Sequence, residues 1–198
     1  MDKTKEKAWH RLLVSETLFG KNKSHKIAYI AVMTALCVVT NMFFEFKLAE
    51  TQFSFTLAFS VLTGMIIGPL FGFIACFLGD LVGFLYHSAG YMYMPWVGIS
   101  LGVAALISGL VMNGLRRDNP WFLYVKLGIV CFLTFAICTV AINTTAFWLL
   151  YSKVDYWTYL ITRLFVQGQI WNTLVNSVLL FVAVPTLNGI KPLKICIR

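Results

Sequence analysis

The sequence predicts an all-α integral membrane protein with six transmembrane helices. Of its 198 residues, 59% are hydrophobic and only 12% are charged, whereas soluble domains are about 45–50% apolar. The apolar residues gather in stretches long enough to cross a bilayer, which takes about 20 residues per helix. Six such crossings with short connections use up a chain of this length, so no separate soluble domain is expected.

The helices are expected where Gly, Pro and polar residues bound the apolar stretches. They cover residues 26–46, 53–67, 69–87, 95–115, 121–151 and 157–187. Together they form a membrane domain over residues 26–190, preceded by a basic leader (1–25) and followed by a short tail (191–198). The longest polar connection, residues 47–52, is expected to be a mobile external loop that closes over a bound solute.

Basic residues are distributed unevenly along the chain. Of the 16 lysines and arginines, all but Lys47, Lys153 and Arg163 fall on the side of the membrane domain that carries the N-terminus. Because cytoplasmic segments carry the excess of Lys and Arg, both termini are expected in the cytoplasm. The leader also carries Trp9, which favours a short interfacial helix over the alternative of a disordered basic tail. Topology thus explains the net charge of +8, and no nucleic-acid partner is expected.

Residues 53–87 are typical of two helices joined by a tight turn. Gly64, Gly68 and Gly72 recur every fourth residue, and small residues at this spacing let helices pack closely in lipid. Pro69 cannot continue a helix passively, so the chain is expected to turn at Gly68 and Pro69.

A single carboxylate, Asp80, lies midway along the helix expected over residues 69–87. Ionisable groups are expensive at this depth and usually functional. Two interpretations remain open: a proton relay with His87, seven residues on, or a structural pair with a polar side chain such as Asn143.

The last helix is the most polar of the six and predicts a binding pocket. Its polar residues are Arg163, Gln167, Gln169, Asn172 and Asn176. Arg163 lies roughly 9 Å into this helix from its outer end, and Asn143 lies at a similar depth on the preceding helix. The polar groups therefore converge in the outer half of the membrane, which predicts an outward-facing pocket. Aromatic residues near its rim are Tyr91, Tyr93, Trp96, Trp157 and Tyr159.

Candidate substrate-binding residues are Arg163, Gln167, Asn143, Asp80, Trp96, Gln52 and Asn172. The alternative is that Arg163 extends toward the interface, or is neutralised by Glu45 or Glu50, and that the aromatics form an ordinary interfacial belt.

Several chemistries lack their motifs. The chain has no G-x-x-x-x-G-K-[ST], H-E-x-x-H or nucleophile elbow, so neither ATP binding through a P-loop nor intramembrane catalysis is expected. Its five cysteines are scattered without a C-x-x-C pair, so no disulfide, metal site or cofactor is expected.

The order of several short motifs resembles a known family. KIAYIAVMTAL contains Ala31-x-x-x-Ala35, similar to the A-x-x-x-A helix of S components, the substrate-binding membrane subunits of energy-coupling factor (ECF) vitamin transporters. GPLFG supplies the G-P-x-x-G turn of that superfamily, and GYMYMPWVGISLGVAALISGLV, INTT and TRLFVQGQIWN resemble its folate-type branch. One segment departs, because folate-type members tend to read P-G-F-T-L where this chain has Pro95-Trp96-Val97-Gly98-Ile99-Ser100-Leu101.

The resemblance implies a high-affinity subunit that captures folate or a related pterin at the bacterial cytoplasmic membrane. It implies a complex with a transmembrane coupling subunit and two ATPases, which would supply the ATP hydrolysis, and it places the coupling contact on Ala31 and Ala35. The alternatives are an S component for another heterocycle, such as a deazapurine precursor, a stand-alone secondary transporter, or a membrane scaffold. A secondary transporter would show inverted repeats and coupling-ion sites, and neither is evident in the sequence.

Overall fold

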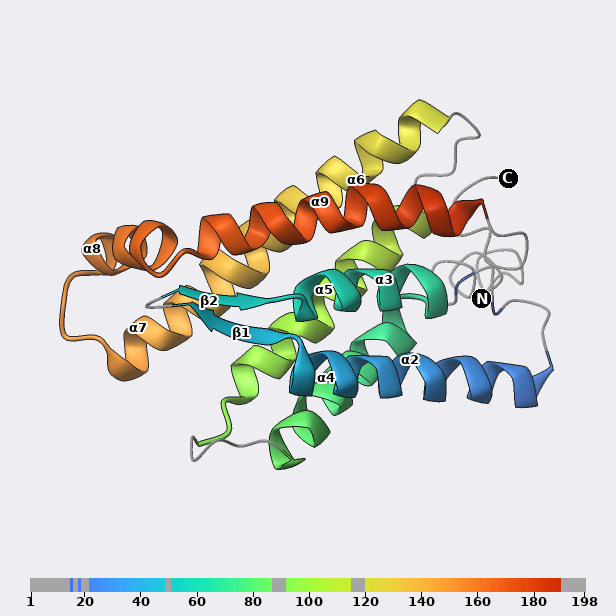
Figure 1. Cartoon of the computed structure of the whole chain (residues 1–198), viewed down its shortest axis with the longest axis horizontal. Coiled ribbons are helices and arrows are strands. Elements are labelled where there is room, and N and C mark those ends of the chain that lie inside the picture. Colours follow the sequence, from blue (N-terminus) through green and yellow to red (C-terminus); the bar gives the residue numbers. More distant parts are fainter. Residues whose placement is uncertain are drawn as a thin grey trace, which may run out of the picture.

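The computed structural model describes residues 15, 18, 22–48, 51–86, 92–114 and 120–189, which are almost entirely helical (Figure 1). The helices are α2 (Lys23–Phe43), α3 (Thr56–Ile67), α4 (Pro69–Tyr86), α5 (Pro95–Gly114), α6 (Pro120–Thr134), η1 (Phe135–Thr144), α7 (Thr145–Tyr151), α8 (Tyr156–Ile161), η2 (Thr162–Val166) and α9 (Gln169–Asn188). The segments η1 and η2 are π-helical.

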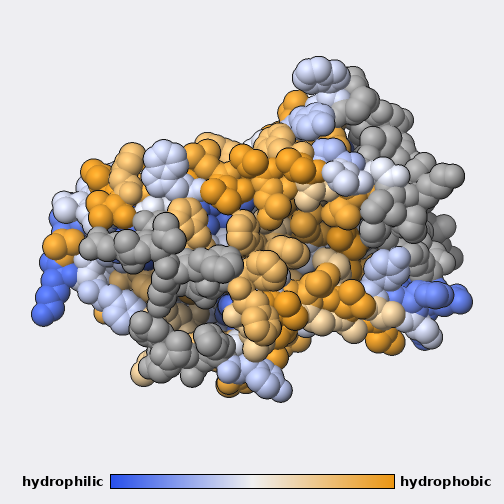
Figure 2. Space-filling model, viewed as in Figure 1, coloured by the Kyte–Doolittle hydropathy of each residue, from blue (hydrophilic) through white to orange (hydrophobic). Residues whose placement is uncertain are grey.

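Five of the described helices are long and apolar enough to cross a membrane. They are Lys23–Phe43, Pro69–Tyr86, Pro95–Gly114, Trp121–Tyr151 and Gln169–Leu187. Helix α3 has 12 residues, fewer than the roughly 20 that a full crossing takes. Hydrophobic side chains cover the middle of the face in Figure 2, and hydrophilic residues gather toward its ends. A nearly all-helical, multi-pass membrane protein is thus confirmed, while the sixth crossing and the cytoplasmic termini stay predictions.

A β-hairpin occupies the segment in which the sequence predicted the ends of two helices and the loop between them. Strands β1 (Glu45–Leu48) and β2 (Thr51–Ser54) pair antiparallel, with Leu48 opposite Thr51. The predicted helices over 26–46 and 53–67 were therefore too long at this junction. The first strand sequence, EFKL, alternates polar and apolar residues, which is the period of a strand.

The predicted turn at Gly68 and Pro69 is confirmed, and glycines bring three helices together around it. Gly68 has a φ of 94° between α3 and α4. A Cβ added to Gly64 would overlap the carbonyl oxygen of Ala105 on α5, and one added to Gly109 would lie 2.6 Å from the backbone nitrogen of Pro69. Close packing of α3, α4 and α5 therefore depends on glycines, which have no side chain, as expected in lipid.

The main hydrophobic core also includes α3. It joins α3 to α5, α6, η1 and α9, and its buried members include Val61, Ala104, Leu127, Cys138 and Leu180. A second cluster joins α2, α3 and α4, and Leu18 of the leader is fully buried in it. The rest of the predicted interfacial helix, and the tail, lie outside the described residues.

The prediction of one continuous helix over residues 157–187 was wrong. The chain passes from α8 into η2, stops at Gln167, and begins α9 after Gly168, whose φ is 71°. The backbone N–H of Gln167 donates to Thr162 O at 3.0 Å, a bond to the fifth residue back. Because such wide turns and a left-handed glycine both end an α-helix, the polar residues before and after Gly168 belong to separate helices.

Candidate functional site

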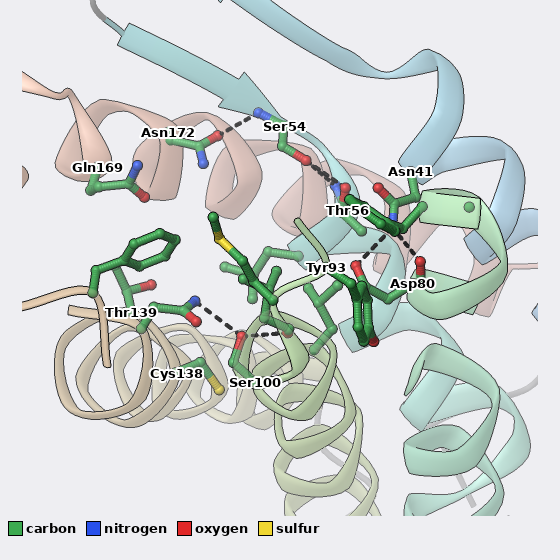
Figure 3. A pocket seen from close by; sticks show the side chains of 18 of the residues that line it. Asn41, Ser54, Thr56, Asp80, Tyr93, Ser100, Cys138, Thr139, Gln169 and Asn172 are labelled. Carbon is green, nitrogen blue, oxygen red and sulfur yellow. Dashed lines mark hydrogen bonds between the residues drawn. The ribbon is translucent and has the colours of Figure 1, made fainter. Parts of the chain in front are cut away.

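A cavity of about 800 Å³ opens between α2, α4, α5, η1 and α9 (Figure 3). Its lining residues are Asn41, Met42, Ser54, Thr56, Leu57, Asp80, Gly83, Phe84, Met92, Tyr93, Met94, Val97, Ser100, Leu101, Cys138, Thr139, Asn143, Phe147, Arg163, Gln169, Asn172 and Thr173. The volume falls in the range of small-molecule sites, and a few polar groups among apolar ones is their usual composition. Of the predicted site residues, the cavity brings together Arg163, Asn143, Asp80 and Asn172.

Arg163 is a buried cation held mainly by aromatic rings. It is 8% exposed, and its guanidinium carbon lies 4.2 Å from the centroid of the Phe147 ring. Nη1 donates to the hydroxyl of Tyr159 over a long 3.4 Å, and Nε is buried with no hydrogen-bond partner in the described part of the chain. No carboxylate contacts Arg163 within the described part of the chain, in which the side chain of Glu45 and all of Glu50 are not included. Its free donors therefore suit an acceptor supplied by a ligand.

Trp96 lies behind this cation rather than at the cavity. Its ring packs edge-on against Phe147, with centroids 5.8 Å apart at 89°, and against Tyr151 at 6.5 Å. Its indole nitrogen is buried and has no hydrogen-bond partner among the described residues. Trp96 thus supports the ring on which Arg163 stacks, and it does not line the cavity.

Asp80 is paired with a residue that the sequence did not indicate. Nδ2 of Asn41 donates to Oδ1 of Asp80 at 2.8 Å, which joins α2 to α4. Asn143, the example of a partner that the sequence offered, instead donates through Nδ2 to the hydroxyl of Ser100 at 3.0 Å, and its Oδ1 is buried without a hydrogen-bond partner among the described residues. The relay with His87 concerns a residue outside the described ones.

Tyr93 lies beside the same carboxylate. A Cβ added to Gly98 would lie 2.8 Å from Oδ2 of Asp80 and 2.9 Å from the hydroxyl of Tyr93, so both groups occupy the space above this glycine. The Tyr93 hydroxyl is close enough to interact electrostatically with the Asp80 carboxylate, but it has no partner in hydrogen-bond geometry among the described residues. Burial first, and then the charge of Asp80, raise the pKa of Tyr93 to about 12. The phenol is therefore a neutral donor at any physiological pH.

Asn172 and Asn176 attach the hairpin to α9. Ser54 N donates to Oδ1 of Asn172 at 3.1 Å, and Nδ2 of Asn176 donates to Ser54 O at 2.7 Å. Oδ1 of Asn176 accepts from the backbone N–H of Ala58 at 3.1 Å. Both amides therefore fix one wall of the cavity, while Nδ2 of Asn172 has no acceptor among the described residues and remains available to a ligand.

The remaining candidates divide between the cavity and its surroundings. Gln167 stands at the helix break and does not line the cavity, whereas Gln169 does. Gln52 lies in β2, and the position of its side chain is outside what the structure describes. Asn41 and Thr139 line the cavity without having been candidates; an isolated asparagine in the apolar helix 26–46 was the available signal for the first.

Ala31 and Ala35 are both exposed on α2. Val32 and Leu36, next to them, are 59% and 41% exposed. The two alanines therefore lie on an outer face of the molecule rather than in a contact within it.

Comparisons with known proteins identify the family and the fold. Residues 21–191 match the family model described as ECF-type riboflavin transporter, S component. Among solved structures, the crystal structure of FolT bound with folic acid is similar in fold, with a TM-score of 0.63, 23% identity, and coverage of 81% of this chain and 92% of that one. No curated protein matches. The chain therefore belongs to the ECF-type riboflavin transporter S-component family, and it is a transport subunit rather than an enzyme.

Proposed function

We propose that this chain is the high-affinity binding subunit of an ECF-type vitamin transporter and that its solute is folate or a related pterin. The observation that carries the proposal is Arg163, a buried cation that borders the cavity with free donors and no carboxylate from the described residues. Planar guanidinium groups match carboxylates and heterocycle edges with two parallel hydrogen bonds. Folate offers both kinds of group, and the fold is shared with a protein crystallised with folic acid.

The exposed face of α2 around Ala31 and Ala35 is proposed as the contact with a transmembrane coupling subunit, which works with two ATPases. Small side chains allow close helix contact without fixing a single register. The leader (1–25) and tail (191–198) are proposed to lie at the cytoplasmic face of a bacterial membrane. In this arrangement the chain binds the solute, and its partners supply the energy.

Riboflavin is the second candidate, because the matching family model bears its name. Another heterocycle, such as a deazapurine precursor, would also fit a cavity of about 800 Å³. A stand-alone secondary transporter is the alternative mechanism.

Calorimetry on the detergent-purified chain with folic acid and riboflavin tests the solute. We expect folic acid to bind at least tenfold more tightly; equal or weaker binding would reject folate. Uptake by vesicles with and without the coupling subunit and ATPases tests the mechanism. Uptake that persists without the ATPases would indicate a secondary transporter.

A further inference from the structure

The hydrogen-bonding groups at the Asp80 end of the cavity indicate which class of ring it can bind. We propose that Asp80 binds an amino group and an adjacent ring N–H of the ligand, so that the cavity selects 2-amino-4-oxopyrimidine rings, found in pterins and deazaguanines, over the dioxopyrimidine ring of flavins. This inference rests on the proposed function and specifies the part of the ligand that the site reads.

The carboxylate of Asp80 is anchored through one oxygen and directed over Gly98 with the other. Asn41 donates to Oδ1 at 2.8 Å from α2, while Oδ2 points over Gly98 toward Tyr93 of the segment before α5. Figure 3 shows Asn41, Asp80 and Tyr93 gathered at one end of the cavity, away from Thr139 and Gln169. A carboxylate accepts up to about four hydrogen bonds, so it can bind further donors besides Asn41.

Two ring systems differ at the edge that would face this group. A 2-amino-4-oxopyrimidine presents two parallel N–H donors, from the amino group and the adjacent ring nitrogen, which match the two oxygens of a carboxylate. A dioxopyrimidine replaces the amino group with a carbonyl, so an acceptor would face the Asp80 oxygens. Buried acceptors that face each other lose their hydrogen bonds and repel, which discriminates strongly between such ligands.

The other end of the cavity has the opposite pattern. Arg163 is stacked on Phe147, and its one described polar contact is with Tyr159, so it shares no contact with the Asp80 group. Donors of the ligand would thus bind at Asp80, and carbonyl or anionic groups would bind at Arg163. This polarity fixes the direction in which an elongated ligand lies.

Gly98 is the residue that makes the Asp80 end possible. Any side chain there would come within 3 Å of both Asp80 Oδ2 and the Tyr93 hydroxyl and displace them. The sequence PWVGISL, in which the chain departs from the folate-type pattern, puts glycine at this position. Glycine at position 98 thus leaves room for the carboxylate and the phenol side by side.

Pterin and lumazine provide the test, because they share the same fused ring and carry an amino or an oxo group, respectively, at position 2. Calorimetry would be done on the purified chain with both compounds, with 7-deazaguanine and with riboflavin. We expect pterin to bind at least about tenfold more tightly than lumazine. In Asp80→Asn that ratio should fall to about threefold or less, since an amide oxygen accepts only one of the two donors.

Two further variants show whether the change in the pterin-to-lumazine ratio is specific to Asp80. Tyr93→Phe removes the neighbouring hydroxyl and should lower the ratio less than Asp80→Asn does. Thr139→Val, on the opposite wall, should weaken pterin and lumazine equally and leave the ratio as it is. An unchanged ratio in Asp80→Asn would overturn the inference.

Binding to the wild-type chain distinguishes failure of this inference from failure of the proposed function. Lumazine or riboflavin binding as tightly as pterin would overturn the inference even if folic acid binds, and the proposed function would then stand. Binding of 7-deazaguanine but not folic acid would reject folate and keep the inference. Binding of none of these compounds would reject both.

Discussion

Arg163→Lys tests whether the buried guanidinium serves the ligand or the fold. The substitution keeps a positive charge in place but removes the planar pair of donors. Within the described structure Arg163 makes one long hydrogen bond, at 3.4 Å, and one ring contact, at 4.2 Å. Because these contacts are few, the ligand-free protein should lose little stability, and most of the loss should appear in ligand binding.

The magnitude follows from the hydrogen bonds that a lysine cannot reproduce. A hydrogen bond to a charged group contributes about 1.5–3 kcal/mol. Losing one of two parallel bonds should therefore raise Kd by roughly 10- to 150-fold at 1.4 kcal/mol per factor of ten. The lost stacking on Phe147, about 0.5–2 kcal/mol, affects the free and the bound protein alike.

Calorimetry with folic acid measures the Kd, and a thermal melt of the ligand-free protein measures the stability. Lys153→Gln is the matched control, since it removes an exposed cation that does not line the cavity. Normal affinity in Arg163→Lys would place the ligand elsewhere. A ligand-free protein that no longer folds would show that the guanidinium group serves packing.

Three further predictions concern other parts of the molecule. Replacing Ala31 or Ala35 with Trp should reduce uptake by the assembled transporter while leaving the ligand affinity of the isolated chain intact, because both residues are exposed on α2; equal loss of both would place them in an internal contact. Hydrogen exchange at residues 47–52 should slow when ligand binds, since β2 joins the cavity wall; unchanged exchange would exclude this hairpin as a gate. Gly68→Ala should lower stability by about 1–3 kcal/mol, because a φ of 94° with a ψ of 168° is a conformation essentially restricted to glycine. Gly128→Ala, where a Cβ meets open space in α6, should instead stabilise by about 0.5–1 kcal/mol; similar melts for both would contradict this reasoning.

The helices and the tight turn were predictable from the sequence. The apolar stretches indicated the helices, and Gly68 with Pro69 indicated the turn, because both signals depend on local sequence alone. The convergence of Asn143 and Arg163 on one cavity was also predicted, from their similar depth on consecutive helices.

Pairings across the bundle were not predictable in the same way. Asp80 had several polar candidates, and only the packing of α2 on α4, where a Cβ on Gly83 would lie 3.1 Å from that of Asn41, selects Asn41. Likewise, Cys37 and Cys76 looked isolated in the sequence, yet their Sγ atoms lie 3.7 Å apart. The break at Gly168 was missed because a single glycine within a helical stretch is usually tolerated.

The π-helical stretch η1 has a consequence for how this protein tolerates changes in length. Deleting one residue from an ordinary helix such as α5 rotates everything after it by about 100° and would turn its cavity-lining residues away. In Phe135–Thr144 the same deletion can be absorbed when a wide turn closes into an ordinary one, so that α7 and Phe147 keep their direction. Single-residue insertions and deletions among relatives should therefore concentrate in this stretch, where the chain can vary in length without losing the ring on which Arg163 rests.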